Sequence, residues 1–187
     1  VPYLGFIPTF PHQNAEDGAP IPPGLEDLYV HFRPTSRVAE AARSVRTNLL
    51  FMRPGKPLRS LLITSGGPRE GKSSTTTTIG ITIASSANRT VLVDTDMRKP
   101  RLHKIFGMTS DIGLTSYLLT RDPISNFTRP TDVPGLDLLA CGPLPPNPSE
   151  LLHTDRFREM VRELLAILGL LLIPGFALIS EVLDLAV

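Results

Sequence analysis

One stretch of the chain has the residue types and the spacing of a loop that binds phosphate. Residues 65–74, SGGPREGKSS, contain the pattern G-x-x-x-x-G-K-[ST] and follow the apolar run SLLIT. The glycines let the backbone come close to a phosphate, and the amino end of a helix that begins near Lys72 attracts its negative charge. The lysine of such a loop reaches the β- and γ-phosphates of a nucleotide, and the next hydroxyl, that of Ser73, binds Mg²⁺.

This pattern predicts a nucleotide site, because it lies between an apolar strand-like run and a helix. The alternative is a surface turn rich in glycine and proline that is followed by a helix. The residues predicted to contact the nucleotide are those of the loop and of the first turn after it: Gly66, Gly67, Pro68, Arg69, Glu70, Gly71, Lys72, Ser73 and Ser74.

Two carboxylates follow the next apolar run. Asp94 comes directly after TVLV and Asp96 two residues later, at the edge where open α/β sheets bind their ligands. Beside a phosphate loop, Asp94 is placed to hold Mg²⁺ or its water, or to accept a proton from an incoming hydroxyl. The alternative is that Asp94 only caps the next helix. Three basic residues beyond it either bind phosphate or solvate the surface: Arg98, Lys99 and Arg101.

The elements that must position these groups alternate between short apolar strands and helices. Strands are predicted at SLLIT, TVLVD and LDLLA, and helices over 36–52, 72–87, 101–106, 114–120 and 148–168. This alternation indicates a parallel sheet with helices on both faces. The predicted fold class is therefore α/β, a mainly parallel sheet of the P-loop NTPase type flanked by helices. We expect residues 1–34 to form an extended arm and residues 35–187 to form the domain.

The first of these helices carries three charged residues at a spacing of three: Glu40, Arg43 and Arg46. Each step of three residues falls about 60° short of a full turn, so the side chains lie on one side of the helix. A solvated face is the usual role of such charges, and the spacing alone does not favour an interface.

Composition excludes several classes of protein. The 187 residues suffice for one domain, and a net charge of +1 provides no field that would attract nucleic acid. The single cysteine, Cys141, predicts a buried small side chain in a reducing compartment. Residues 1–35 lack the basic start and apolar core of a signal peptide. A proline–glycine pair interrupts the apolar run Leu164–Ser180, which favours a strand and a following helix over a membrane span.

Taken in order, these pieces resemble the bacterial tyrosine kinases (BY-kinases) of capsule and exopolysaccharide export. YLGFIP is similar to the segment that leaves the membrane-anchored part in that family, and EAARSVRTNLLF to its E-x-x-R-x-x-R subunit-contact helix. SGGPREGKSS resembles its Walker A motif and VLVDTDMRKPRLHKIFG its second, A′, motif. GLTSYLL and LDLLACGPLPPNPSELL are similar to two further stretches, of which the second is the most specific.

The resemblance implies an ATP-dependent kinase that acts on protein tyrosine. By analogy, Lys72 and Ser73 handle phosphate and Mg²⁺, while Asp94 and Asp96 assist the metal and the tyrosine hydroxyl. The implied catalytic residues are thus Lys72, Asp94 and Asp96, with Ser73 and Asp94 as metal ligands. The expected partners are further copies bound through Glu40, Arg43 and Arg46, a membrane polysaccharide co-polymerase or activator domain, upstream or in trans, and a protein tyrosine acceptor. The expected location is the cytoplasmic face of the bacterial membrane.

The chain departs from the family pattern near its C-terminus. The family has a Walker B strand that ends in aspartate, whereas in GLLLIPGFALISEVLDLAV the expected position is occupied by Ile173. We expect the domain to be incomplete after about residue 168, without the tyrosine-bearing tail of the family. A truncated gene, a frameshift near Leu168 and a degenerate paralogue each explain this pattern.

Two other functions stay open. One is a noncatalytic, nucleotide-binding interaction module of a polysaccharide-export complex. The other is a partitioning-type ATPase, although such ATPases carry a second lysine early in the phosphate loop, where this chain has Gly67.

Overall fold

The computed structural model describes residues 3–10, 20–52, 58–86, 88–167 and 170–174. Five strands form one sheet in the order β1-β5-β2-β4-β3. Their bounds are β1 Ser60–Ile63, β2 Thr90–Val93, β3 Thr128–Pro130, β4 Leu136–Leu139 and β5 Leu170–Pro174. All neighbouring strands are parallel except β3 and β4. The mainly parallel α/β sheet predicted from the sequence is confirmed, and β5 lies between the strands that precede the two motifs.

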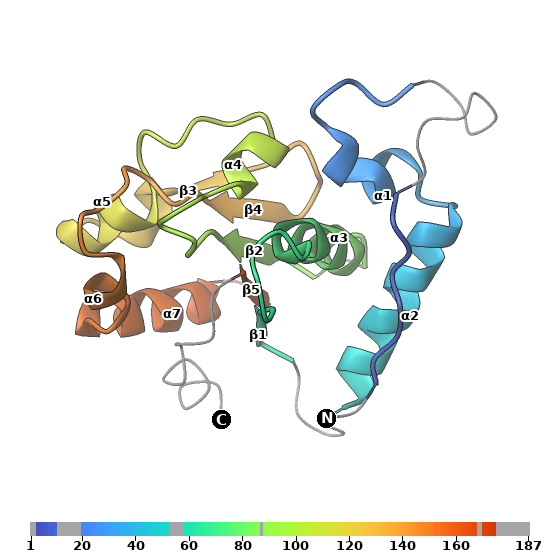
Figure 1. Ribbon diagram of the computed structural model, residues 1–187. Coiled ribbons are helices and arrows are strands. Elements are labelled where there is room, and N and C mark those ends of the chain that lie inside the picture. Colours follow the sequence, from blue (N-terminus) through green and yellow to red (C-terminus); the bar gives the residue numbers. More distant parts are fainter. Residues whose placement is uncertain (1–2, 11–19, 53–57, 87, 168–169, 175–187) are drawn as a thin grey trace.

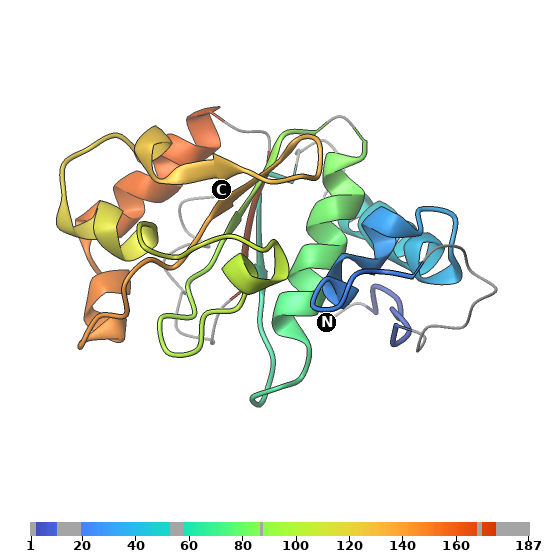
Figure 2. The same cartoon turned by 90° about the horizontal axis from the view of Figure 1, so that it is seen from above.

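Helices cover both faces of this sheet (Figures 1 and 2). Helix α3 (Lys72–Ala84) lies on one face, with α2 (Arg37–Phe51) and α1 (Tyr29–Phe32) outside it. The other face carries α5 (Leu114–Leu119), α6 (Pro148–Leu152) and α7 (Asp155–Ile167). Two apolar clusters result, one on each side of the strands, and β5 contributes Leu172 to the first and Leu171 and Ile173 to the second.

Helix α3 forms against the preferences of its own sequence. It contains a run of threonines, which lose side-chain freedom in a helix. Burial compensates, because every residue from Thr76 to Ala84 is buried between the sheet and α2. Gly80 lets the helix lie close to the sheet, since a Cβ there would stand 2.7 Å from Leu92 Cδ2. Close packing therefore fixes the helix whose first turn follows the phosphate loop.

Helix boundaries agree with the sequence at α2 but differ near the C-terminus. Ser36 caps α2, with its hydroxyl accepting a hydrogen bond from Ala39 N at 3.2 Å. The single helix expected over 148–168 is instead two helices, α6 and α7. Thr154 lies between them, where its hydroxyl donates to Leu151 O and accepts from Phe157 N. The threonine thus ends one helix and caps the next.

Residues near the N-terminus pack against the domain. A short 3₁₀ helix, Glu26–Leu28, precedes α1, and Ile21 and Val30 are buried in the first apolar cluster. The segment 3–10 follows α2 (Figure 1), and Phe10 stacks on Tyr29 with ring centroids 5.6 Å apart. Residues 26–32 are therefore helical rather than extended. The division into an arm, 1–34, and a domain, 35–187, stays a prediction.

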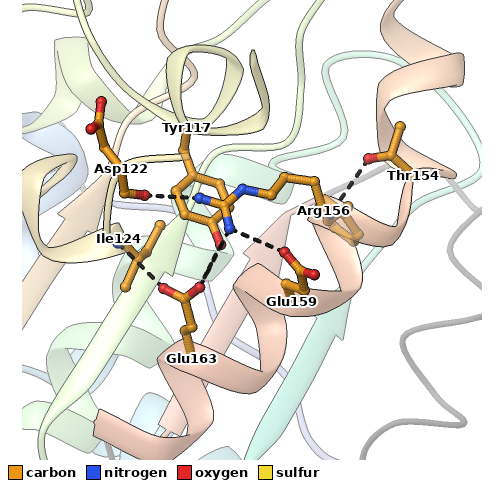
Figure 3. A network of polar contacts seen from close by, with 8 residues as sticks. Tyr117, Asp122, Ile124, Thr154, Arg156, Glu159 and Glu163 are labelled. Carbon is orange, nitrogen blue, oxygen red and sulfur yellow. Dashed lines mark hydrogen bonds and ion pairs between the residues drawn. The ribbon is translucent and has the colours of Figure 1, made fainter. Parts of the chain in front are cut away.

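A partly buried polar network joins α5 to α7 (Figure 3). The hydroxyl of Tyr117 donates to Glu163 Oε1 at 2.9 Å, and the other oxygen of this carboxylate accepts from Ile124 N at 3.3 Å. The guanidinium of Arg156 lies 3.9 Å from the centre of the Tyr117 ring and donates to Asp122 O at 2.8 Å. Glu163 thus serves three groups at once and holds α5 and its following loop on α7.

The apolar run Leu164–Ser180 contains the end of α7 and the strand β5, so the predicted strand is confirmed, while the predicted following helix lies outside the described residues. Among the helices that the structure describes, none is long and apolar enough to cross a membrane. Cys141 is fully buried, as predicted, and burial raises the pKa of its thiol to about 12.

Helix α4 (Leu102–Ile105) agrees with the helix predicted over 101–106. The strand β3 was not predicted. It has three residues, ends at Pro130 and pairs only with β4, and such short strands with proline are confined to the edges of sheets.

Candidate nucleotide site

The phosphate loop joins the carboxyl end of β1 to the first turn of α3. Gly71 precedes the helix with φ +83°, a conformation that glycine adopts without steric cost. Arg69 also has a positive φ, +62°, which is uncommon for a residue with a side chain and marks a constrained turn. Gly71 offers no side chain to cap α3, so the first N–H groups of the helix lack a side-chain cap and can serve an anion.

Polar contacts organise the loop around Lys72. Its Nζ donates to Ser65 Oγ at 2.8 Å and to Gly67 O at 3.0 Å. Within the loop, Gly67 N donates to Glu70 Oε2 at 3.0 Å. A carboxylate of the chain therefore occupies one of the loop's N–H groups, which shows that this N–H is presented to an anionic oxygen.

A cavity of about 350 Å³ brings the two sequence motifs together. From the loop and α3 it is lined by Pro68, Arg69, Glu70, Gly71, Lys72 and Ser73, and from the turn after β2 by Asp96, Arg98, Lys99 and Arg101. The two motifs meet because β1 and β2 run parallel on either side of β5 and end at the same edge. Of the remaining predicted contact residues, Ser74 lines a neighbouring cavity, and Gly66 and Gly67 line neither.

Asp94 lies beneath this cavity rather than in its wall. It is 1% exposed, and its carboxylate accepts hydrogen bonds from three backbone N–H groups: Asp96 N at 3.2 Å, Arg101 N at 3.0 Å and Leu102 N at 2.9 Å. Burial raises the pKa of this carboxyl to about 6, against the opposing effect of the hydrogen bonds. Asp94 therefore organises the turn and the start of α4, as in the alternative that it only caps the next helix. Its roles in catalysis and in metal binding stay predictions.

The stability of the protein is expected to depend on pH through Asp94. The pKa of the carboxyl is 3.8 when exposed and about 6 in the folded chain, so the folded chain holds the extra proton between these values. The stability that this group contributes therefore falls as the pH rises from about 4 to about 6, by about 3 kcal/mol in total. In urea unfolding, we expect the free energy of unfolding to fall less for Asp94→Asn than for the parent when the pH rises from about 4.5 to about 7. Equal losses in the two proteins would contradict this assignment.

Two of the oxygen-bearing side chains of the cavity, Asp96 and Ser73, could hold a metal ion. Both line it, and Asp96 Oδ1 also accepts from Lys99 N at 2.9 Å, which fixes the carboxylate. Hydroxyl and carboxylate oxygens are the ligands that Mg²⁺ prefers, together with phosphate oxygens and water. In the part of the chain that the structure describes, no three acidic, histidine or cysteine side chains cluster as a metal site. These residues therefore fit a Mg²⁺ that is shared with a bound phosphate.

Asp27 contacts both motifs and was not predicted as a site residue. One carboxylate oxygen accepts a hydrogen bond from Ser74 Oγ, and the other pairs with Arg101 Nη2 at 2.6 Å. The side chain thus ties the segment before α1 to α3 and to the turn after Asp94. Its 47-residue separation from Ser74 left no local pattern by which it could be recognised. Arg101, Arg98 and Lys99 all line the cavity, and Arg101 is also paired with a carboxylate.

The three charged residues of α2 make contacts within the chain. Arg46 Nη1 donates to Thr82 O at 2.9 Å, across to α3, and Arg43 Nη1 donates to Pro34 O at 2.7 Å. Arg43 also lies 3.5 Å from Glu40 Oε1, and Glu40 is exposed. These contacts hold the side chains in place on one side of the helix. The prediction that they form a subunit interface remains a prediction.

A second, larger cavity lies on the other side of the amino end of α3. It has a volume of about 810 Å³ and shares Glu70 and Gly71 with the first cavity. Its remaining walls come from the segment 7–10, from Glu26 and Asp27, and from the first turns of α3. The phosphate loop therefore separates a small cavity that is lined by many charged residues from a larger one that is lined in part by Phe10.

No family model matches the chain, but relatives of known name do. CapB of Staphylococcus aureus is 38% identical over 141 residues, 75% of this chain and 62% of that protein. YwqD of Bacillus subtilis, which is named as a tyrosine-protein kinase, is 36% identical over 130 residues, 70% of this chain and 55% of that protein. The crystal structure of the chimerical protein CapA2B2 superposes with a TM-score of 0.82 and 32% identity, covering 98% of this chain and 75% of that one. The kinase domain of Escherichia coli tyrosine kinase ETK superposes with a TM-score of 0.79 and 26% identity, covering 100% and 74%. The chain thus spans about three fifths of the length of CapB.

Proposed function

Because this chain belongs to the bacterial tyrosine kinases (BY-kinases), we propose that it is an ATP-dependent kinase module that phosphorylates protein tyrosine in a capsule or exopolysaccharide system. The observation that supports this most is the cavity in which the phosphate loop faces the turn that carries Asp96. A site that offers loop N–H groups, a lysine and an acidic turn within one cavity suits phosphoryl transfer better than simple anion binding.

In this proposal, each group of the site has a separate role. The first N–H groups of α3 and Lys72 hold the phosphates, and Ser73 and Asp96 would hold Mg²⁺. When bound, Mg²⁺ supplies positive charge that offsets the charge of the phosphates. Asp94 is the proposed proton acceptor for the tyrosine hydroxyl. Its pKa of about 6 lies not far below neutral pH, so its carboxyl is ionised at neutral pH.

The larger cavity suits the nucleoside. It adjoins the phosphate loop at Gly71 and Ser74, and its volume of about 810 Å³ is ample for a purine and a ribose. Phe10 offers an aromatic face that is already held by its stacking on Tyr29. We propose that the adenosine of ATP lies here while its phosphates reach across the loop.

The partners and the location are proposed because the chain belongs to this family. Further copies would bind through Glu40, Arg43 and Arg46, of which Glu40 is exposed and Arg43 and Arg46 are half-buried. A membrane polysaccharide co-polymerase or activator domain, upstream or in trans, would bring the module to the cytoplasmic face of the membrane. Loss of self-association in Glu40→Lys would support the first part of this assignment.

The proposal is tested by supplying ATP, Mg²⁺ and a glutamate–tyrosine copolymer and measuring phosphotyrosine and free phosphate separately. Phosphotyrosine that disappears in Asp96→Ala would support the kinase. Release of phosphate without any phosphotyrosine would contradict it and favour the partitioning-type ATPase.

A second candidate function, a noncatalytic nucleotide-binding module, is favoured by Ile173. This side chain is fully buried in the second apolar cluster, one residue before the end of β5, and is paired in register with Leu62 of β1. We propose that it occupies the position of the Walker B aspartate, so that the site lacks one carboxylate near the metal. Losses of this kind cost about 10–100-fold in metal affinity or activity.

Ile173→Asp tests this interpretation. Ile173→Asn is the control, because asparagine has nearly the shape of aspartate but carries no charge. A buried carboxylate without a partner destabilises the nucleotide-free protein. We therefore expect Mg²⁺ with ATP to raise the melting temperature of the aspartate variant more than that of the asparagine variant, and Mg²⁺ affinity to rise by about 10–100-fold. The same response in both variants would show that residue 173 does not act through a metal.

A further inference from the structure

The three tyrosines of the chain differ sharply in their access to solvent. Tyr117 is fully buried, and its hydroxyl is already committed to Glu163 at 2.9 Å. Tyr29 is 7% exposed and is stacked on Phe10. Tyr3, in contrast, is 83% exposed. An enzyme that phosphorylates the folded chain therefore has one accessible tyrosine hydroxyl to act on, that of Tyr3.

The backbone beside Tyr3 is held against α2. The carbonyl oxygen of Leu4 accepts a hydrogen bond from Asn48 Nδ2 at 2.8 Å. Gly5 lies so close to the same helix that a Cβ would stand 2.9 Å from Val45 Cγ2. Tyr3 lies beside these anchored residues with its ring in solvent, and it lines neither of the cavities at the phosphate loop. Its own chain thus displays the hydroxyl outward instead of inserting it into the site.

We propose that Tyr3 is a self-phosphorylation site and that a second copy of the chain supplies the catalytic site. This proposal rests on the proposed kinase function. The Tyr3 Oη attacks the γ-phosphorus of ATP, so that a bond from Oη to phosphorus forms while the bond from that phosphorus to the β-phosphate oxygen breaks. ADP leaves with the electron pair of the broken bond, and the phenolic proton passes to a carboxylate of the acting copy or to water.

A phosphate group on Tyr3 would lie near the helix that carries the proposed subunit contact. Phe6, three residues on, is 70% exposed, and both side chains lie on a segment seated on the helix that carries Glu40, Arg43 and Arg46. A phosphotyrosine adds nearly two negative charges to this surface. Phosphorylation of Tyr3 would therefore change the charge beside the proposed subunit contact.

The first experiment compares Tyr3→Phe with Tyr29→Phe, each of which removes a single hydroxyl. The purified chain is incubated with ATP and Mg²⁺, with and without the glutamate–tyrosine copolymer, and phosphotyrosine is mapped by mass spectrometry. We expect Tyr3→Phe to lose at least about 90% of self-phosphorylation while it labels the copolymer at the parent rate. Tyr29→Phe is expected to keep both activities.

Two outcomes would overturn the proposal, and they have different meanings. Labelling of the copolymer without labelling of Tyr3 would show that the kinase function holds and that Tyr3 is not its site. Labelling of neither the chain nor the copolymer would refute the kinase function, and the proposal for Tyr3 would fall with it.

A mixing experiment tests transfer between copies. A Lys72→Met chain, which retains Tyr3, is mixed with an active Tyr3→Phe chain that carries a tag of different mass. Phosphate on Tyr3 of the Lys72→Met chain is expected. An unlabelled mixture, under conditions in which the parent chain labels itself, would contradict transfer between copies.

Discussion

Replacing Lys72 with methionine is expected to weaken the binding of ATP by about 10- to 150-fold, because a hydrogen bond from a charged donor is lost, at about 1.5–3 kcal/mol. Methionine keeps the length and the apolar stem of the side chain but removes the ammonium group. This group also bridges Ser65 Oγ and Gly67 O, at 2.8 and 3.0 Å. The substitution therefore removes both a phosphate ligand and a tie within the loop. Calorimetric titration with a non-hydrolysable ATP analogue and Mg²⁺ measures the change.

Lys99→Met is the matched control for this prediction. Lys99 lines the same cavity, but from the exposed turn beyond Asp96. Its charge lies in solvent, where electrostatic contributions are small and screened by salt. We expect a change of less than about threefold in affinity. Equal effects of the two substitutions would mean that the loop lysine has no special contact with phosphate, which would contradict the site.

Replacing Glu163 with alanine is expected to destabilise the fold by about 1–2 kcal/mol, because two hydrogen-bond donors lose their acceptor. The hydroxyl of Tyr117 and the N–H of Ile124 both donate to this carboxylate, and Arg156 lies 3.7 Å from it (Figure 3). Alanine can accept none of these contacts. The Tyr117 residue is buried, but the Glu163 side chain is 36% exposed, so water can enter part of the space that alanine leaves and limits the loss. Urea unfolding, with an unchanged m-value, measures the loss.

Glu159→Ala provides the control, since it removes a carboxylate from the same helix and the same arginine. Glu159 Oε2 lies 3.0 Å from Arg156 Nη1, but its side chain is 53% exposed. An exposed pair of this kind contributes at most about 1 kcal/mol. A loss in Glu159→Ala as large as that in Glu163→Ala would show that the network owes its strength to charge rather than to buried hydrogen bonds.

Local patterns in the sequence were sufficient to predict the elements that carry the site. The strands β1, β2 and β4 were predicted because each is a short apolar run, which is typical of strands that are buried on both faces. The helix predicted over 36–52 agrees with α2, Arg37–Phe51, to within one residue at each end. The phosphate loop was predicted because its glycines and Lys72 have a fixed spacing. All of these signals lie within a few residues of what they determine.

Other features depend on contacts between residues far apart in the chain, and the sequence alone could not place them. Asp27 joins Ser74 and Arg101 only after the chain before α1 has folded onto α3. The break between α6 and α7 required Thr154 to cap rather than to continue a helix, and its side chain can do either. The edge strand β3 is too short to leave a periodic pattern, and only its pairing with β4 defines it.

The sequence by itself determined which residues could bind phosphate and which elements would carry them, since both depend on local spacing and on runs of apolar residues. The tertiary structure decided what each group does there. It placed Asp94 beneath the cavity on three backbone N–H groups and Asp96 in its wall, although the two are separated by one residue. It also buried Tyr29 and Tyr117 and left Tyr3 exposed. Burial and the direction of a side chain arise from packing across the whole fold, so they are settled only when the distant parts of the chain come together.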